Sequence, residues 1–113
     1  IRMLWLSECP VKDISPLKKT PLESLTVENT PVDDISAFQG HPIQRLHIGG
    51  TQVTDLSPIR NMRLTRLIFT PAKIEKGLEH ARSMPALRQI GTNFDEMMPP
   101  PAFWQAYDAG KIK

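Results

Sequence analysis

The sequence lacks the features that mark several common classes of protein. Its single cysteine excludes an internal disulfide framework and any zinc site built from several cysteines. The 14 basic and 12 acidic side chains leave a formal charge of +2, too near neutrality to indicate a nucleic-acid binder or a polybasic membrane binder. Apolar runs are only a few residues long, so no membrane insertion is predicted. The 113 residues suffice for one domain, and the start at Ile1 rather than Met leads us to expect a piece of a longer protein.

Motifs that would indicate an enzyme are also missing. The three histidines, His41, His47 and His80, do not form a metal-ligand spacing such as His-Glu-x-x-His. No Gly-x-Ser-x-Gly elbow is present, so a serine hydrolase has no support. The pair Gly49 and Gly50 lacks the Gly-Lys-Ser/Thr ending of a phosphate loop and instead indicates a tight turn. We therefore expect a non-enzymatic protein with no catalytic residue, no cofactor and no metal.

What the sequence does contain is an internal repeat of 21 residues. An Asp-x-Ser motif begins at Asp13, Asp34 and Asp55, and each copy continues with a Pro or Ala and then an apolar residue. Several apolar columns keep the same step: Ile1, Leu22, Ile43 and Leu64; Leu4, Leu25, Leu46 and Leu67; Val11, Val32, Val53 and Ile74. Because many independent columns agree on one period, the repeat is a property of the fold.

The apolar spacing within each unit is Leu-x-x-Leu-x-Leu, followed by Thr or Cys and then Val-x-Asp-Leu-Ser-Pro-Leu. This pattern resembles the leucine-rich repeat and covers residues 1–92, about four and a half copies. The family usually has Asn or Cys at the ladder position, where this chain has Cys9, Thr30, Thr51 and Ala72. Cys9 is expected to be a buried core residue. A threonine hydroxyl can bind the turn backbone and an alanine cannot, so we expect the ladder to weaken in the fourth copy.

The pattern within one unit supports the same architecture on physical grounds. Leu25 and Val27 alternate with polar residues, which predicts a short half-buried strand. The Ser-Pro pairs that follow suit a turn or a short 3-10 segment better than a full helix. The expected fold is an α/β solenoid: a leucine-rich-repeat horseshoe with short parallel strands on its concave face. Turns and 3-10 segments would form the convex face, and a helical cap would close the C-terminal end.

The repeat changes in its fourth copy, where two residues are inserted. Ile74, Leu78 and Ala81 recur at helical spacing and predict an α-helix of about two to three turns. Leu87 and Ile90 then predict a fifth strand, after which the repeat ends.

Residues 93–113 form the second predicted part of the chain, a Pro-rich connector and a short aromatic helix at 102–110. Prolines precede this helix and Gly110 follows it, which is the usual order of these residues at helix ends. Phe103, Trp104 and Tyr107 supply three of the seven aromatic residues. We expect the helix to cap the last open edge of the repeats, with an aromatic ligand site as the alternative.

This Phe-Trp-x-x-Tyr-Asp-x-Gly ending is similar to the tails of leucine-rich-repeat regions in bacterial receptor-like serine/threonine protein kinases. The resemblance implies the C-terminal repeat segment of a larger kinase-like signalling protein. No glycine-rich phosphate loop, His-Arg-Asp or Asp-Phe-Gly motif is present, so a catalytic domain would lie outside this chain. A single cysteine fits either a reducing or an oxidising compartment, and the localisation stays open.

The outward positions of the predicted strands are the candidate binding surface. Five strands would make a face about 20 Å wide, which suits a peptide or a small protein epitope. Trp5, His47 and Ile68 fall in one column with Arg45 and Arg66 beside it, and Trp and Arg are enriched at binding hot spots. Alternatively, Trp5 covers the first repeat or contacts an upstream copy. The predicted binding residues are Trp5, Glu28, Arg45, His47, Arg66 and Ile68.

Charge and edge exposure leave further alternatives open. Residues 1–56 carry a formal charge of −2 and residues 57–113 carry +4, which fits an acidic partner, an anionic polymer or merely solvated arginines. Aromatic residues do not interleave with the basic ones, so no nucleic-acid partner is predicted. The aligned Asp13, Asp34 and Asp55 are expected to cap turns rather than to bind calcium. An uncovered first strand at 1–6 would need upstream sequence or a second copy, so a homodimeric assembly module is the alternative function.

Overall fold

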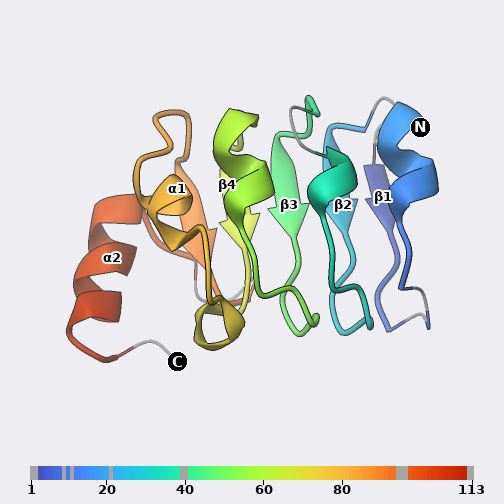
Figure 1. The fold of residues 1–113 in the computed structure, drawn as a ribbon. Helices are drawn as coiled ribbons and strands as arrows, with labels where there is room; N and C mark the ends of the chain where they lie inside the picture. The colour runs from blue at the N-terminus through green and yellow to red at the C-terminus, as the bar shows by residue number, and fades with distance from the viewer. Residues whose placement is uncertain are drawn as a thin grey trace.

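The fold is a single parallel sheet of five strands in the order β1-β2-β3-β4-β5, so each strand lies beside the next one in sequence (Figure 1). The computed structural model describes residues 3–8, 10, 12–20, 22–38, 41–93 and 97–111. Ile1, Cys9 and Val11, which belong to the repeat columns, lie outside the described residues. The strands are β1 (Met3–Trp5), β2 (Ser24–Thr26), β3 (Arg45–His47), β4 (Arg66–Ile68) and β5 (Gln89–Gly91).

The strand register follows the sequence repeat. Leu4 pairs with Leu25, Leu25 with Leu46, and Leu46 with Leu67, each a step of 21 residues. The next step, from Leu67 to Ile90, is 23 residues long, as the predicted insertion requires. The central side chains of β2 to β5 are buried, so they point to the core, while the residues on either side of them belong to the opposite face. The sequence therefore predicted both the strand positions and which of their side chains face the core.

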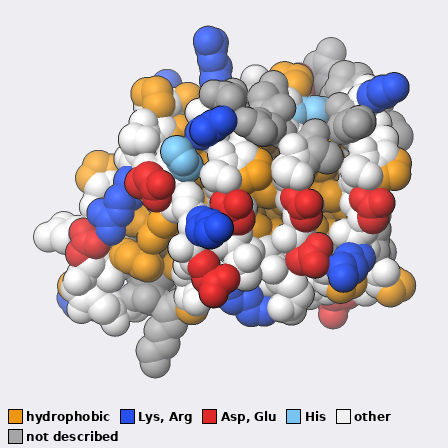
Figure 2. All heavy atoms as spheres, viewed as in Figure 1, with side chains coloured by type: hydrophobic (Ala, Val, Ile, Leu, Met, Phe, Trp, Pro, Cys, Tyr) orange, Lys and Arg blue, Asp and Glu red, His pale blue; other side chains and the backbone are white. Residues whose placement is uncertain are grey.

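Short 3-10 helices return the chain across the other side of the core (Figure 1). They are η1 (Ser15–Lys19), η2 (Ser36–Phe38), η3 (Ser57–Asn61) and η4 (Pro71–Lys73). In the first three, Asp13, Asp34 and Asp55 each accept the backbone N–H of the serine two residues later, at 2.8–2.9 Å. The prediction that these aspartates cap turns is thus confirmed. Figure 2 shows acidic side chains in a row across this face.

Hydrogen bonds to the serines also set the charge state of the three carboxyl groups. The pKa of each is lowered, mainly by the serine N–H at Asp34 and Asp55 and by the serine hydroxyl at Asp13. Because these bonds favour the charged carboxylate, the caps are strongest when the carboxyl groups are ionised.

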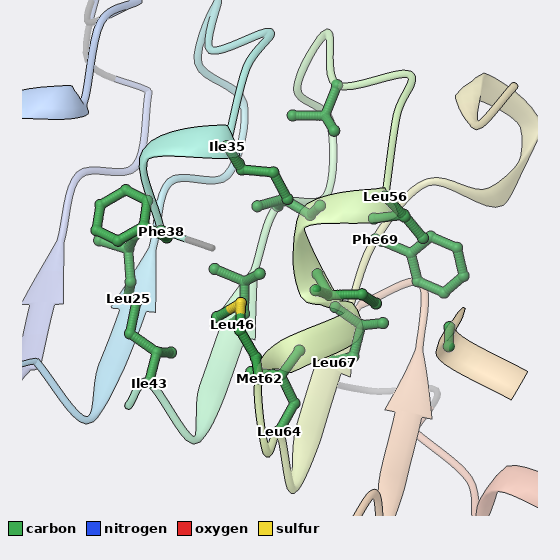
Figure 3. Packing of buried hydrophobic residues seen from close by; sticks show 14 of the residues in the cluster. Leu25, Ile35, Phe38, Ile43, Leu46, Leu56, Met62, Leu64, Leu67 and Phe69 are labelled. Atoms are coloured by element: carbon green, nitrogen blue, oxygen red, sulfur yellow. The ribbon is translucent and has the colours of Figure 1, made fainter. Parts of the chain in front are cut away.

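The core lies between the strands and the 3-10 helices. Strand leucines such as Leu25 and Leu67 are 0% exposed, and Figure 3 shows them facing the side chains of Phe38 and Leu56. The ladder position lies at the edge of this core: Thr30 and Thr51 donate their hydroxyl hydrogens to the carbonyls of Val27 and Ile48, both at 2.7 Å. Each threonine hydroxyl thereby gives a turn carbonyl close to the core a short hydrogen bond.

The turn after each strand explains why the fourth unit departs from the others. Glu8, Asn29 and Gly50 occupy equivalent positions and have positive φ angles of 58°, 54° and 71°. The next equivalent residue is Pro71, whose ring fixes φ near about −65° and forbids this conformation. The chain instead forms η4, and Ala72 lies exposed rather than buried at the ladder position. The expected weakening of the ladder is confirmed, and the proline supplies a backbone cause for it.

The predicted helix of the fourth unit is shorter than expected. Helix α1 (Leu78–Arg82) contains five residues rather than two to three turns, and Ile74 lies outside it. Before the helix, the Lys76 carbonyl accepts the Leu56 N–H at 2.8 Å, which keeps this stretch extended. Gly77 follows with φ 85°, and a Cβ there would lie 2.3 Å from a backbone nitrogen of η3. Helical geometry can therefore begin only after Gly77.

The C-terminal helix α2 (Pro100–Asp108) starts two residues earlier than predicted and covers the far end of the sheet from β1 (Figure 1). Phe103 and Trp104 are 0% and 7% exposed, and the Phe103 ring centroid lies 5.9 Å from that of Phe69. Met98 and Ile90 exchange two backbone hydrogen bonds of 2.9 Å along the outer edge of β5. The aromatic residues therefore belong to the core and favour a cap over a ligand site.

Arg82 links α1 to α2 at the surface of the molecule. The Arg82 guanidinium lies 4.5 Å from the Trp104 ring centroid and 5.7 Å from that of Tyr107. Arg82 also forms an ion pair with Asp108. Cation–π and ionic contacts of exposed groups contribute little stability each, so the buried aromatic core supplies most of the attachment.

We predict that Asp34→Ala lowers the free energy of unfolding by about 1 kcal/mol, because the first N–H of η2 loses its acceptor. Asp34→Asn should lose much less, since an asparagine oxygen can accept the same bond. Urea unfolding checks both values. The neighbouring Asp33→Ala is the matched control, because the contact that the structure gives Asp33, with Lys12 at 3.6 Å, is exposed to solvent. Equal losses for Asp33 and Asp34 would contradict the capping role.

We predict that Phe103→Ala lowers the free energy of unfolding by about 3–5 kcal/mol, as expected for a fully buried aromatic ring. Arg82→Ala should cost far less, because its ion pair is exposed to solvent. Urea unfolding of the two variants checks the order. A larger loss for Arg82→Ala would show that the surface cluster, not the core, holds α2.

Candidate functional site

A shallow hollow of about 180 Å³ lies on the sheet face that points away from the core and the 3-10 helices. The short side chains of Ser24 and Thr26 on β2 lie between the larger side chains of Trp5 on β1 and Arg45 on β3. This difference in size accounts for the depression. We name it the strand-face hollow, and its outward-facing lining residues are Met3, Trp5, Ser24, Thr26, Arg45, His47, Arg66 and Ile68.

The β1 end of the hollow is apolar and open to solvent. Met3 is 63% exposed and Trp5 is 57% exposed, which makes them the large exposed hydrophobic residues of the described chain. Trp5 therefore faces solvent as the sequence predicted. Two neighbouring large apolar side chains that are exposed to solvent are more typical of interaction sites than of the rest of a protein surface.

Two predicted binding residues of the same column are not solvent-facing. His47 is 4% exposed and Ile68 is 0% exposed, although both occupy outward positions in register with Trp5. A Cβ built on Gly49 would lie 3.4 Å from the Thr92 carbonyl oxygen, so the backbone just after β5 lies close to the turn that follows β3. Local alternation placed the two side chains on the correct face, but it carried no information on what covers them.

Glu28, another predicted binding residue, does not line the hollow and instead belongs to a polar chain beside it. The Ser7 hydroxyl donates to Glu28 Oε1 at 2.9 Å, and Glu28 Oε2 lies 3.2 Å from His47 Nε2. The Gly49 N–H donates to His47 Nδ1 at 3.1 Å. The imidazole therefore accepts at Nδ1 and carries its proton at Nε2, toward the carboxylate.

Burial governs the protonation of this histidine. It lowers the pKa of His47 below the ordinary value near 6.5, although the Glu28 carboxylate opposes the shift. A second proton at Nδ1 would also remove the acceptor of the Gly49 N–H. His47 is therefore neutral at pH 7 and acts as a positioning residue for the turn rather than as a source of charge.

The β3–β4 end of the hollow is cationic. Arg45 and Arg66 are partners in the register of adjacent strands, and both are partly exposed. Arg66 Nε–H donates to the neutral amide of Gln89 at 3.0 Å. Among the described residues neither arginine forms an ion pair, so their charges are available to a ligand.

The structure brings Trp5, Arg45, His47, Arg66 and Ile68 to one hollow, with Glu28 outside it. Met3, Ser24 and Thr26 also line the hollow, and they were not among the predicted binding residues. The signal that could have found them is the contrast between small residues on β2 and large ones on the strands beside it.

Within the described ranges, no three His, Cys, Asp or Glu side chains gather as metal ligands would. The described helices are all too short or too polar to cross a bilayer. No known family model matches the sequence, and no curated protein matches it either. The geometry of the strand face is therefore the main basis for assigning a function.

We predict that acidification destabilises the fold through His47. Below its ordinary pKa near 6.5 the unfolded chain binds a proton that the folded chain resists, so stability falls as the pH drops from 6.5 toward the lower folded-state pKa. His47→Gln should therefore flatten the dependence of unfolding free energy on pH between about pH 7 and about pH 5. Urea unfolding across this range is the measurement.

His80→Gln is the matched control for this experiment, because His80 lies in α1 and is distant in sequence from the hollow. It should retain the slope of the native chain. If the slope survives in His47→Gln and disappears in His80→Gln, the attribution to His47 is wrong.

Proposed function

We propose that this chain is a leucine-rich-repeat module that recognises a protein or peptide through its strand face, without catalysis. The 21-residue step, the sequential parallel strands and the 3-10 returns all support the repeat assignment. In such a solenoid every unit presents equivalent outward positions, so neighbouring units together form one continuous surface.

The observation that carries the proposal is the juxtaposition of exposed Met3 and Trp5 with Arg45 and Arg66 across one hollow. Tryptophan and arginine supply a large share of binding energy at protein interfaces, because they combine broad contact area with directional hydrogen bonds. Large apolar side chains exposed beside a depression are best explained by a partner that covers them.

The C-terminal sequence supports a wider context for this module. Phe103, Trp104, Tyr107, Asp108 and Gly110 keep the spacing found at the ends of repeat regions in bacterial receptor-like kinases. We extend the proposal to a repeat segment of a larger bacterial signalling protein. In that setting the strand face would recognise and α2 would terminate the array.

An assembly module is the second candidate, and the state of the β1 edge favours it. Leu4 and Leu6 are only partly buried, whereas the equivalent Leu25 and Val27 are 0% exposed. The other edge of the sheet is covered by the strand-like pairing of Met98. A second copy joined edge to edge at β1 would bury the leucines there.

We predict that peptides selected from an unbiased displayed library will bind the native chain and lose affinity at least about tenfold with Trp5→Ala, since hot-spot truncation removes large contact area. Trp5 is 57% exposed, so the substitution should leave thermal stability nearly unchanged. Fluorescence polarisation with the labelled peptides gives the affinities.

Arg60→Ala is the matched control, because Arg60 is exposed on η3 and outside the hollow. If no peptide depends on Trp5, the recognition proposal is wrong. A mass that doubles with concentration in sedimentation, and that falls with Leu4→Lys, would then establish the assembly module.

A further inference from the structure

The two ends of the strand-face hollow differ in chemistry. On β1, Met3 and Trp5 present apolar surface to solvent. Two and three strands away, Arg45 and Arg66 present guanidinium groups, and no acidic side chain is found among the described lining residues. A ligand that covers the whole hollow must therefore carry an apolar group at one end and an anionic group at the other.

No acidic side chain of the described lining balances the positive charges of Arg45 and Arg66. Arg45 and Arg66 lie on adjacent strands, which are separated by about 4.8 Å, so their charges repel one another. The Glu28 carboxylate bonds to Ser7, lies beside His47 and does not line the hollow. The amide of Gln89 orients Arg66 without neutralising it. A carboxylate between the two guanidinium groups would relieve the repulsion and accept charge-assisted hydrogen bonds from both.

The spacing of the two ends limits what can bridge them. The distance from β1 to β3 is two strand spacings, and the distance from β1 to β4 is three. These distances are about 10–14 Å. An extended peptide rises about 3.3 Å per residue, so it covers this distance in about three to four residues. The side chains between them would lie over Ser24 and Thr26, whose small size leaves the necessary room.

We propose that the strand face binds an extended acidic peptide with a bulky apolar side chain three or four residues from its carboxylates. The apolar side chain packs on Met3 and Trp5, and the carboxylates bind Arg45 and Arg66. This inference rests on the proposed recognition function and names its ligand class.

A single-stranded nucleic acid fits the same face less well. It needs a succession of aromatic platforms along a cationic groove, and Trp5 is the one aromatic ring besides the buried imidazole of His47 in the described lining. The hollow of about 180 Å³ accommodates one large side chain better than a row of bases. An acidic peptide is therefore the occupant that both ends favour.

The test uses four labelled synthetic peptides with fluorescence polarisation. The first has two glutamates, a Gly-Ser spacer and a tryptophan. The second replaces the glutamates with lysines, the third replaces the tryptophan with serine, and the fourth shortens the spacer so that acid and tryptophan adjoin. The first should bind at least about tenfold more tightly than each of the others, because only it satisfies both ends at the correct spacing.

Two double variants of the protein test the contribution of Arg45 and Arg66 to binding. Arg45→Gln with Arg66→Gln should weaken the first peptide at least about tenfold and remove most of its salt dependence between roughly 50 mM and roughly 500 mM sodium chloride. Arg60→Gln with Arg63→Gln removes the same charge from exposed sites outside the hollow and should change little.

The outcomes separate this inference from the general function. If library-selected peptides depend on Trp5 but are neutral or basic and bind the Arg45/Arg66 variant equally, the acidic preference is wrong and recognition stands. If no peptide depends on Trp5 or the arginines, both proposals are wrong. A single-stranded oligonucleotide that binds as tightly as the first peptide would also overturn the assigned ligand class.

Discussion

The structure depends on one constraint: every unit must return the chain to the same backbone register beside its predecessor. The return is made by hydrogen bonds between units, such as Leu6 N–H to the Thr26 carbonyl at 2.7 Å and Val27 N–H to the His47 carbonyl at 2.9 Å. Strands of three residues have no stability of their own, so each unit is stable only against its neighbours. The same register aligns outward side chains into columns and thereby creates the hollow.

The constraint also explains where the regular array ends. The first three units each have a residue with positive φ after the strand, and Pro71 cannot adopt that conformation in the fourth. The fourth unit therefore adopts a different turn, and its longer path leads into α1 and then β5. The departure also places Arg82 of α1 next to Trp104 and Asp108 of α2, while the buried Phe103 and Trp104 hold α2 over the end of the sheet. The irregular fourth unit thus supplies contacts for the C-terminal cap.

Sequence alone predicted the features that are local and repeated. Strand positions, the caps at Asp34 and Asp55, and the Thr30 hydroxyl bond follow from side-chain chemistry within a few residues. The aspartate cap recurs in three copies and the threonine bond in two. The short length of α1 was not predicted, because it depends on the bond between Lys76 and Leu56 in different units. The burial of His47 was missed for a similar reason, because the turn after His47 is approached by Thr92, which follows a segment outside the 21-residue repeat.

The chain's own covering of the sheet face also determines where a ligand can bind. Near Gly49 the backbone at Thr92 lies close to the sheet, and the Glu28 carboxylate there accepts a hydrogen bond from Ser7 and lies beside the neutral His47. What stays open is the region where apolar exposure and unpaired positive charge meet, between Trp5 and Arg45. A carboxylate–guanidinium contact is stronger where water is excluded from it. The apolar end and the cationic end should therefore act together. An apolar anchor on Trp5 would exclude water from the arginines, and the arginines would select which anchored peptide stays bound.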